Sequence, residues 1–193
     1  ATPHFAEEIW AALGNQGMVA QAHLSPITEE SEEERLAIAR EIYVQRVIDQ
    51  ARQMRDLAER HIDGELTSIT IQCAEEWKGE LCRIGMGLQE EGYQMKQALK
   101  VIMTREFAHD PGIRKMIPPA WKRVMKQLYK WSPEERSVLK ASLDETAIIE
   151  EASTFIKEEL RVSSLSVYVA GEGEDIGGKA RFAFPSEPGI AYL

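Results

Sequence analysis

The segment Leu66–Ala74, which reads Leu-Thr-Ser-Ile-Thr-Ile-Gln-Cys-Ala, decides the fold class of this 193-residue chain. It is rich in β-branched residues and alternates apolar with polar positions, a pattern typical of a β-strand. Gly64 separates it from a helical pattern on its N-terminal side. Towards the end of the chain, Leu165–Ala170 predicts a second strand, and 182–193 contains a third short extended segment.

Helical periodicity dominates the rest of the chain. A helix is predicted over residues 2–13, where Phe5, Ile9 and Leu13 form an apolar stripe, and a long helix runs from Thr28 to about Arg60. Five helices are predicted after the first strand. The first carries Trp77, the second carries Met95, and the third starts at Pro118-Pro119. The fourth starts at the capping box Ser132–Glu135, and the fifth covers about 145–160. The pattern predicts a mainly helical α+β fold, with a helical part over 1–63 and a small α/β domain with few strands over 64–193.

Net charge alone argues against a nucleic-acid binder. The chain carries 32 acidic and 23 basic side chains and a formal charge of −9, whereas affinity for nucleic acid comes largely from phosphate neutralisation. The charge is uneven, however, because residues 112–131 contain six basic side chains and no carboxylate. The local distribution therefore carries more information than the sum.

Within this basic segment, Lys122, Lys126 and Lys130 recur every four residues, so a helix gathers them on one face with Arg123 at its flank. A cationic stripe beside aromatic residues favours binding to a phosphate backbone. A solvated helix face balanced by acidic neighbours has the same spacing, and the spacing leaves both interpretations open. The candidate RNA-binding residues are Lys115, Lys122, Arg123, Lys126 and Lys130.

The sequence predicts no catalytic residue and no metal ligand. Cys73 and Cys82 lack the spacing of a zinc site and are interpreted as ordinary buried thiols. Gly173–Lys179 has the spacing of a phosphate-binding loop, but its carboxylates and the absence of a following helix argue against that function. We also expect no membrane span and no secretory signal, since apolar runs are short and no leader pattern opens the chain, and hence a cytoplasmic location.

The first 27 residues contain a specific motif. Thr2–Gly14 reads Thr-Pro-His-Phe-Ala-Glu-Glu-Ile-Trp-Ala-Ala-Leu-Gly, and a small-residue loop closing at a proline follows. This segment resembles the end of the anticodon-binding helical domain of class I aminoacyl-tRNA synthetases of the leucine, isoleucine and valine group. The positions that match are Pro3, His4, Glu7, Glu8, Trp10, Gly14 and Pro26.

Later segments narrow the resemblance to leucyl-tRNA synthetases of the archaeal and eukaryotic type. The strand leading into Ala74–Lys78 is similar to their C-terminal region, and Lys179–Pro185 with Pro188–Leu193 is similar to their terminus. The resemblance implies that 1–63 is the end of the anticodon-binding bundle and that 64–193 is a C-terminal α/β tRNA-binding domain.

The resemblance also implies what this chain lacks. The catalytic signatures of such enzymes, His-Ile-Gly-His and Lys-Met-Ser-Lys-Ser, do not occur in the sequence, and neither does an editing domain. We therefore expect a part of a longer leucine–tRNA ligase that is inactive alone. ATP and magnesium would belong to the parent enzyme, with no cofactor in this part.

The implied partners are leucine tRNA, in particular its long variable arm, and the remaining domains of the parent synthetase, with no membrane. Two alternatives stay open. One is a non-catalytic protein-interaction appendage that docks through the acidic long helix, and the other is the corresponding region of an isoleucyl- or valyl-tRNA synthetase.

Overall fold

The computed structural model describes residue 8, residues 10–12, 14, 16, 31–61, 64–128 and 130–193, with Glu134 described by its backbone only. The chain divides into two compact units, Ala1–Ser31 and Glu32–Leu193. In the first unit, Trp10 Nε1 donates a hydrogen bond to the Gln16 carbonyl oxygen over 3.4 Å. Of the helix predicted over 2–13, Glu8 and residues 10–12 are described and are helical, whereas its apolar stripe and most of the motif that carries the family resemblance lie outside the described residues.

A three-stranded sheet with the order β2-β1-β3 forms the centre of the second unit. The central strand β1 pairs in parallel with β2, where Ile71 lies opposite Val167, and antiparallel with β3, where Ile71 lies opposite Ile190. The three predicted strands are thus confirmed, although the last one is confined to four residues. The strands are β1 (Ser68–Cys73), β2 (Ser164–Val169) and β3 (Gly189–Tyr192).

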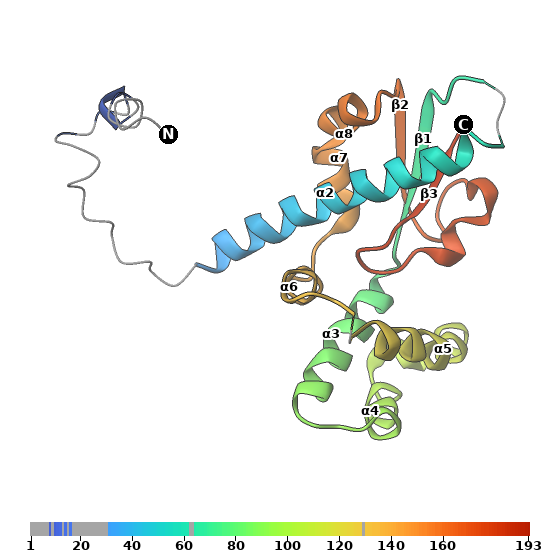
Figure 1. Cartoon of the computed structure of the whole chain (residues 1–193). Coiled ribbons are helices and arrows are strands. Elements are labelled where there is room, and N and C mark those ends of the chain that lie inside the picture. The colour runs from blue at the N-terminus through green and yellow to red at the C-terminus, as the bar shows by residue number, and fades with distance from the viewer. Residues whose placement is uncertain are drawn as a thin grey trace. The chain divides into compact units, whose positions relative to one another are not determined.

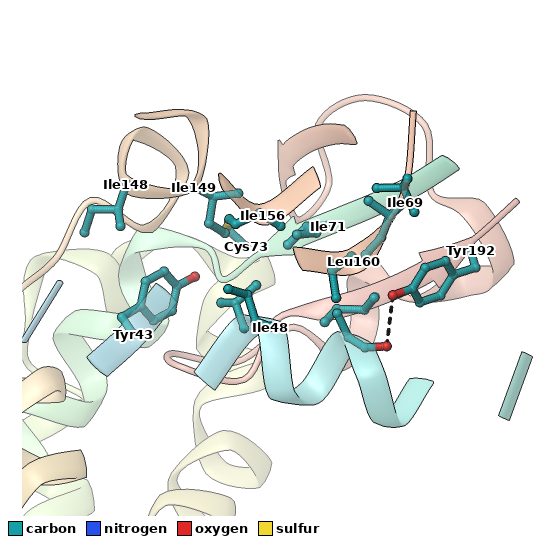
Figure 2. Packing of buried hydrophobic residues seen from close by; sticks show 14 of the residues in the cluster. Tyr43, Ile48, Ile69, Ile71, Cys73, Ile148, Ile149, Ile156, Leu160 and Tyr192 are labelled. Carbon is teal, nitrogen blue, oxygen red and sulfur yellow. Dashed lines mark hydrogen bonds between the residues drawn. The ribbon is translucent and has the colours of Figure 1, made fainter. Parts of the chain in front are cut away.

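One face of the sheet packs against three helices, with the long helix α2 crossing it (Figures 1 and 2). Ile69, Ile71 and Cys73 of β1 share a core with Tyr43 of α2. The hydroxyl of Tyr192 donates a hydrogen bond to a carbonyl oxygen of α2 over 3.0 Å (dashed line in Figure 2). The helices of this layer are α2 (Glu32–Ala58), α7 (Glu145–Glu151) and α8 (Ser153–Leu160).

One sequence prediction changes in this layer. The helix expected over about 145–160 is broken into α7 and α8 at Ala152, whose φ of −84° and ψ of 4° depart from helical values. The long helix packs on the sheet and belongs to the same compact unit, as expected of an apolar stripe that needs a partner. The assignment of residues 1–63 to an anticodon-binding bundle stays a prediction.

A helical lobe, residues 76–140, lies between β1 and β2 in the sequence and has its own core (Figure 1). Trp121 lies fully buried at its centre, and Gly85 makes the close approach possible, because a Cβ there would lie 2.1 Å from the Trp121 ring. The lobe contains α3 (Glu76–Glu90), α4 (Met95–Ile102), η2 (Glu106–His109), α5 (Pro111–Leu128) and α6 (Pro133–Lys140). Together with the sheet, it confirms the mainly helical α+β class.

The start of α5 differs from the prediction. The helix begins at Pro111, because the Asp110 carboxylate accepts hydrogen bonds from the backbone N–H groups of Gly112 (2.7 Å) and Ile113 (2.9 Å). Asp110 therefore caps the start of α5. The prolines at 118 and 119 lie inside the helix rather than at its beginning, and both are exposed, so water can solvate the carbonyls that lose a helical donor.

Candidate nucleic-acid interface

Helix α5 presents its lysines on the side opposite its buried stripe. Lys115, Lys122 and Lys126 follow i, i+7, i+11 spacing and are exposed. At 3.6 residues per turn this spacing keeps them within about 40° of one another around the helix. The stripe that packs into the lobe consists of Ile117, Trp121, Val124 and Leu128. We call the exposed residues Lys115, Lys122 and Lys126 the lysine face.

Lys130 lies near the lysine face but outside the helix. The sequence prediction extended the helix through this residue, whereas α5 ends at Leu128. The backbone N–H of Lys130 donates to the Gln127 carbonyl over 2.7 Å, which forms a turn, and its side chain is exposed. The structure thus groups three of the five candidate cations on one helical face and places a fourth just beyond its end.

Arg123, the fifth candidate, has a different environment. Its guanidinium pairs with the Glu187 carboxylate over 2.6 Å and lies over the Phe184 ring, 4.2 Å from the centroid. It also donates to the carbonyl of Phe182 over 3.3 Å. Much of its charge is therefore neutralised inside the protein, and the geometry indicates that Arg123 braces α5 against the segment that precedes β3.

Glu187 is a residue that the sequence reasoning missed. Its carboxylate also accepts hydrogen bonds from the Gln127 amide over 2.9 and 3.0 Å and lies 3.9 Å from Arg46 of α2. Arg46 pairs in turn with Glu135 at the start of α6 over 2.8 Å. One loop carboxylate thus links α5 with α2, a long-range arrangement for which the sequence holds no local pattern.

The surroundings of the lysine face are basic as well. Residues 92–131 contain nine Lys and Arg side chains against two carboxylates, in a chain whose net charge is −9. Lys96 and Lys100 of α4 are exposed in this segment. The rest of the chain therefore carries the acidic excess, and the positive potential is concentrated on one lobe.

A second, acidic feature lies where the parallel strands end. A cavity of about 840 Å³ is lined by residues that follow β1 and β2 and by the start of α7. Its carboxylates are Glu75, Glu76, Glu80, Asp144, Glu145 and Glu172. Glu145 accepts hydrogen bonds from the backbone N–H groups of Ser186 (2.7 Å) and Ala74 (3.4 Å). This carboxylate therefore joins three chain segments, a structural role.

Burial governs the ionisation of the groups around this cavity. Desolvation raises the pKa of Glu145, although its backbone hydrogen bonds oppose the shift. Burial, followed by the charge of Glu145, raises the pKa of the Cys73 thiol to about 12, and burial also raises the pKa of Cys82. Both cysteines are free and buried, which confirms the interpretation of ordinary buried thiols.

Two further findings concern the described part of the chain. Its His, Cys, Asp and Glu side chains form no group of three or more that could hold a metal ion. Within the same residues, every helix is too short or too polar to cross a membrane.

Comparisons with known proteins add to this geometry. No protein-family model matches the chain. Leucine–tRNA ligase of Methanocaldococcus jannaschii is 28% identical over 192 residues, which is 100% of this chain and 18% of that protein. The ligase of Pyrococcus furiosus is 29% identical over 98% of the chain and 17% of its own length. The ligase of Methanococcoides burtonii is 28% identical over 100% of the chain and 20% of its own length. The chain thus spans about a fifth of the length of these curated relatives.

Proposed function

Since the chain is homologous over its whole length to a C-terminal part of archaeal leucine–tRNA ligases, we propose that it is the tRNA-binding C-terminal region of such a ligase. It contacts leucine tRNA through the lysine face, with the long variable arm as its target. The observation that carries this proposal is the exposed, helically aligned set of Lys115, Lys122 and Lys126 within a basic lobe.

The chemistry of the lysine face suits the phosphates of a duplex. From Lys115 to Lys126 the helix rises by about 16 Å, at 1.5 Å per residue, so the three ammonium groups can reach successive phosphates along a groove. Lysine is a flexible point charge without planar donor geometry, which favours backbone contact over reading of base edges. The lysine face therefore supplies affinity and position, and shape or unpaired bases must supply selectivity.

The same proposal assigns the chemistry of aminoacylation to other parts of the ligase. ATP and magnesium act in the catalytic domain, and this region contributes by holding the tRNA. Alone it is inactive in leucine-dependent ATP–pyrophosphate exchange. The proposed location is the cytoplasm, where tRNA charging takes place, and the remaining domains of the synthetase are its protein partners.

The test compares two double variants in salt titrations of tRNA binding. Lys122→Ala/Lys126→Ala removes two cations of the lysine face, and Arg35→Ala/Arg60→Ala removes two exposed cations outside the basic lobe. Each duplex phosphate contact contributes about 0.9 to the slope of log affinity against log salt, so the first variant should lower the slope by about one to two. The control variant should leave the slope unchanged.

Two tRNAs make the test specific. Leucine tRNA should bind more tightly than a tRNA with a short variable arm, and this preference should narrow in the lysine variant, because only the long arm loses its phosphate contacts to the lysine face. Equal slopes for the wild type and both variants would show that the lysine face is an ordinary solvated helix surface. If the chain binds synthetase domains in a salt-insensitive way and binds no tRNA, the result would instead support the protein-interaction appendage.

A further inference from the structure

Strand β2 leaves one edge of the sheet open. It is an outer strand in the order β2-β1-β3, and no further strand of the described residues pairs with it (Figure 1). The other outer strand, β3, is buried along its whole length, whereas the residues of β2 are half-buried or exposed. Val167 packs against the same core as Ile71 of β1, yet Ile71 is fully buried and Val167 is not. The exposed edge of the sheet therefore runs along β2.

The hydrogen bonds to β1 show which backbone groups of β2 face outwards. The N–H of Ala170, directly after the strand, donates to the Cys73 carbonyl over 2.9 Å. Successive residues of a strand direct their N–H and C=O groups to opposite sides, so the even-numbered residues face β1, and Leu165, Val167 and Val169 face away from it. Within the part of the chain that the structure describes, the N–H groups of these three residues have no acceptor. They are donors for a further strand.

β2 also lacks the features that usually prevent an edge strand from pairing with another chain. Such strands are often very short, carry a lysine or a proline, or contain a bulge. β2 has six residues, Ser-Leu-Ser-Val-Tyr-Val, of which none is charged and none is proline. Its register with β1 is continuous from the first pair to the last, so no bulge interrupts it. The strand therefore permits the addition of another strand.

The two ends of β2 carry opposite charges. Arg161 precedes the strand and Glu172 follows it; both side chains are exposed, and neither forms an ion pair with a described residue. In an antiparallel pair of two β2 strands, outward-facing residues must lie opposite one another, and the two registers of greatest overlap place the two-fold axis at Ser166 or Val167. In both registers, Arg161 lies opposite a neighbour of Glu172 of the second copy. The symmetry provides this contact twice.

We propose that two copies of this chain associate through β2, which pairs antiparallel with β2 of the second copy and extends the sheet across both chains. The side chains of Leu165 and Val167, which pack at the margin of the core, are covered further by the added strand. The charge order along β2 favours the antiparallel direction, because a parallel copy would place equal charges side by side. Two strands of six residues bury less surface than the roughly 1,200–2,000 Å² of a stable interface, so the association is weak, with a dissociation constant in the micromolar range or above.

The experiment measures self-association of the whole chain by sedimentation velocity, from about 1 µM to about 1 mM, the range expected for a small interface. Arg161→Glu and Glu172→Arg each bring like charges together at both symmetric contacts, and each should weaken self-association by about tenfold or more. An equimolar mixture of the two variants should regain the wild-type affinity, because the mixed pair has opposite charges at both contacts. The control Arg105→Glu reverses an exposed charge in the helical lobe and should associate as the wild type does.

A second measurement needs no variant. In amide hydrogen exchange resolved by residue, the N–H groups of Ser166 and Tyr168 should be protected at every concentration, since they are bonded to β1. Those of Leu165, Val167 and Val169 should exchange quickly in the dilute protein and become protected as the copies associate.

Three results would overturn the proposal. They are a strict monomer over the whole concentration range, a dimer whose affinity is the same in Arg161→Glu, Glu172→Arg and the wild type, and fast exchange of the Val167 N–H in the associated protein. The second result would place the interface on another surface. None of these results bears on the binding of leucine tRNA by the lysine face, which has its own salt titration.

Discussion

Removing the Glu187 carboxylate should test whether Arg123 acts as a brace of the fold. The change Glu187→Ala breaks the 2.6 Å pair with Arg123 and the hydrogen bonds from Gln127, and it leaves two arginine side chains without this partner. Hydrogen bonds to charged groups contribute about 1.5–3 kcal/mol when sheltered, whereas exposed ion pairs contribute about 0.2–1 kcal/mol. Because Glu187 is 24% and Arg123 37% exposed, the contact lies between these limits. We expect a loss of about 2 kcal/mol in the free energy of unfolding.

Urea unfolding followed by far-ultraviolet circular dichroism measures this loss. The matched control is Glu151→Ala, which removes a carboxylate that pairs with Arg40 on the surface and is 71% exposed. That change should alter the free energy of unfolding by less than about 1 kcal/mol. The double variant Arg123→Ala/Glu187→Ala should be less destabilised than the sum of the single changes, because the two side chains share one interaction.

Two results would refute this reasoning. A loss for Glu187→Ala no greater than that for Glu151→Ala would mean that the contact contributes no more than a surface pair. Additive losses in the double-variant cycle would mean that Arg123 does not depend on Glu187. RNA binding gives an independent measure, since Glu187→Ala releases the charge of Arg123, and the salt slope for leucine tRNA should then stay equal or rise rather than fall.

Three further predictions concern packing and ionisation. Gly85→Ala should destabilise the chain by about 1–3 kcal/mol in urea unfolding, because its Cβ would lie 2.1 Å from the buried tryptophan of α5. Gly79→Ala in the same helix has open space and should stabilise it by about 1 kcal/mol; equal effects of both changes would contradict the packing argument. Cys73 and Cys82 should not react with a thiol reagent at pH 8 until the protein unfolds, since burial raises both pKa values; rapid reaction in the native state would show that they are accessible. Burial raises the pKa of Glu145 above its ordinary 4.5, so the folded state holds this proton more tightly than the unfolded state does. The contribution of Glu145 to stability is therefore complete below pH 4.5 and declines as the pH rises through the raised pKa of the folded state. Glu145→Gln should remove this decline, which urea titrations at several pH values would measure.

The sequence predicted the elements whose signals are local. The alternation in Leu66–Ala74 located the central strand, and the capping box at Ser132 is present, with the Glu135 N–H donating to Ser132 Oγ over 3.2 Å. The four-residue spacing of lysines also placed Lys122 and Lys126 on one exposed face. Such patterns depend on residues a few positions apart, which is the range over which periodicity and caps act.

Features that depend on distant residues could not be predicted in this way. Pro118 looked like a helix start because proline favours that position, yet the Asp110 cap begins the helix seven residues earlier. Arg123 counted as a free cation until the fold brought Glu187 beside it, 64 residues further along the chain. A hollow of about 450 Å³ on the flank of α5 likewise forms only where α5, Trp77 and residues 180–184 meet.

The hydrogen bond between the Ala74 N–H and the Glu145 carboxylate sets an order of events for folding. The parallel pair β1 and β2 joins Ser68 to Ser164, so the sheet cannot form until a long stretch of chain has closed, which costs conformational entropy. The helical lobe fills most of that stretch with contacts between neighbouring helices, which form quickly. Ala74 and Glu145 flank the lobe on its two sides and are joined by a hydrogen bond of 3.4 Å, so folding of the lobe shortens the effective loop between the strands. The lobe should therefore fold first and act as the nucleus on which the sheet closes.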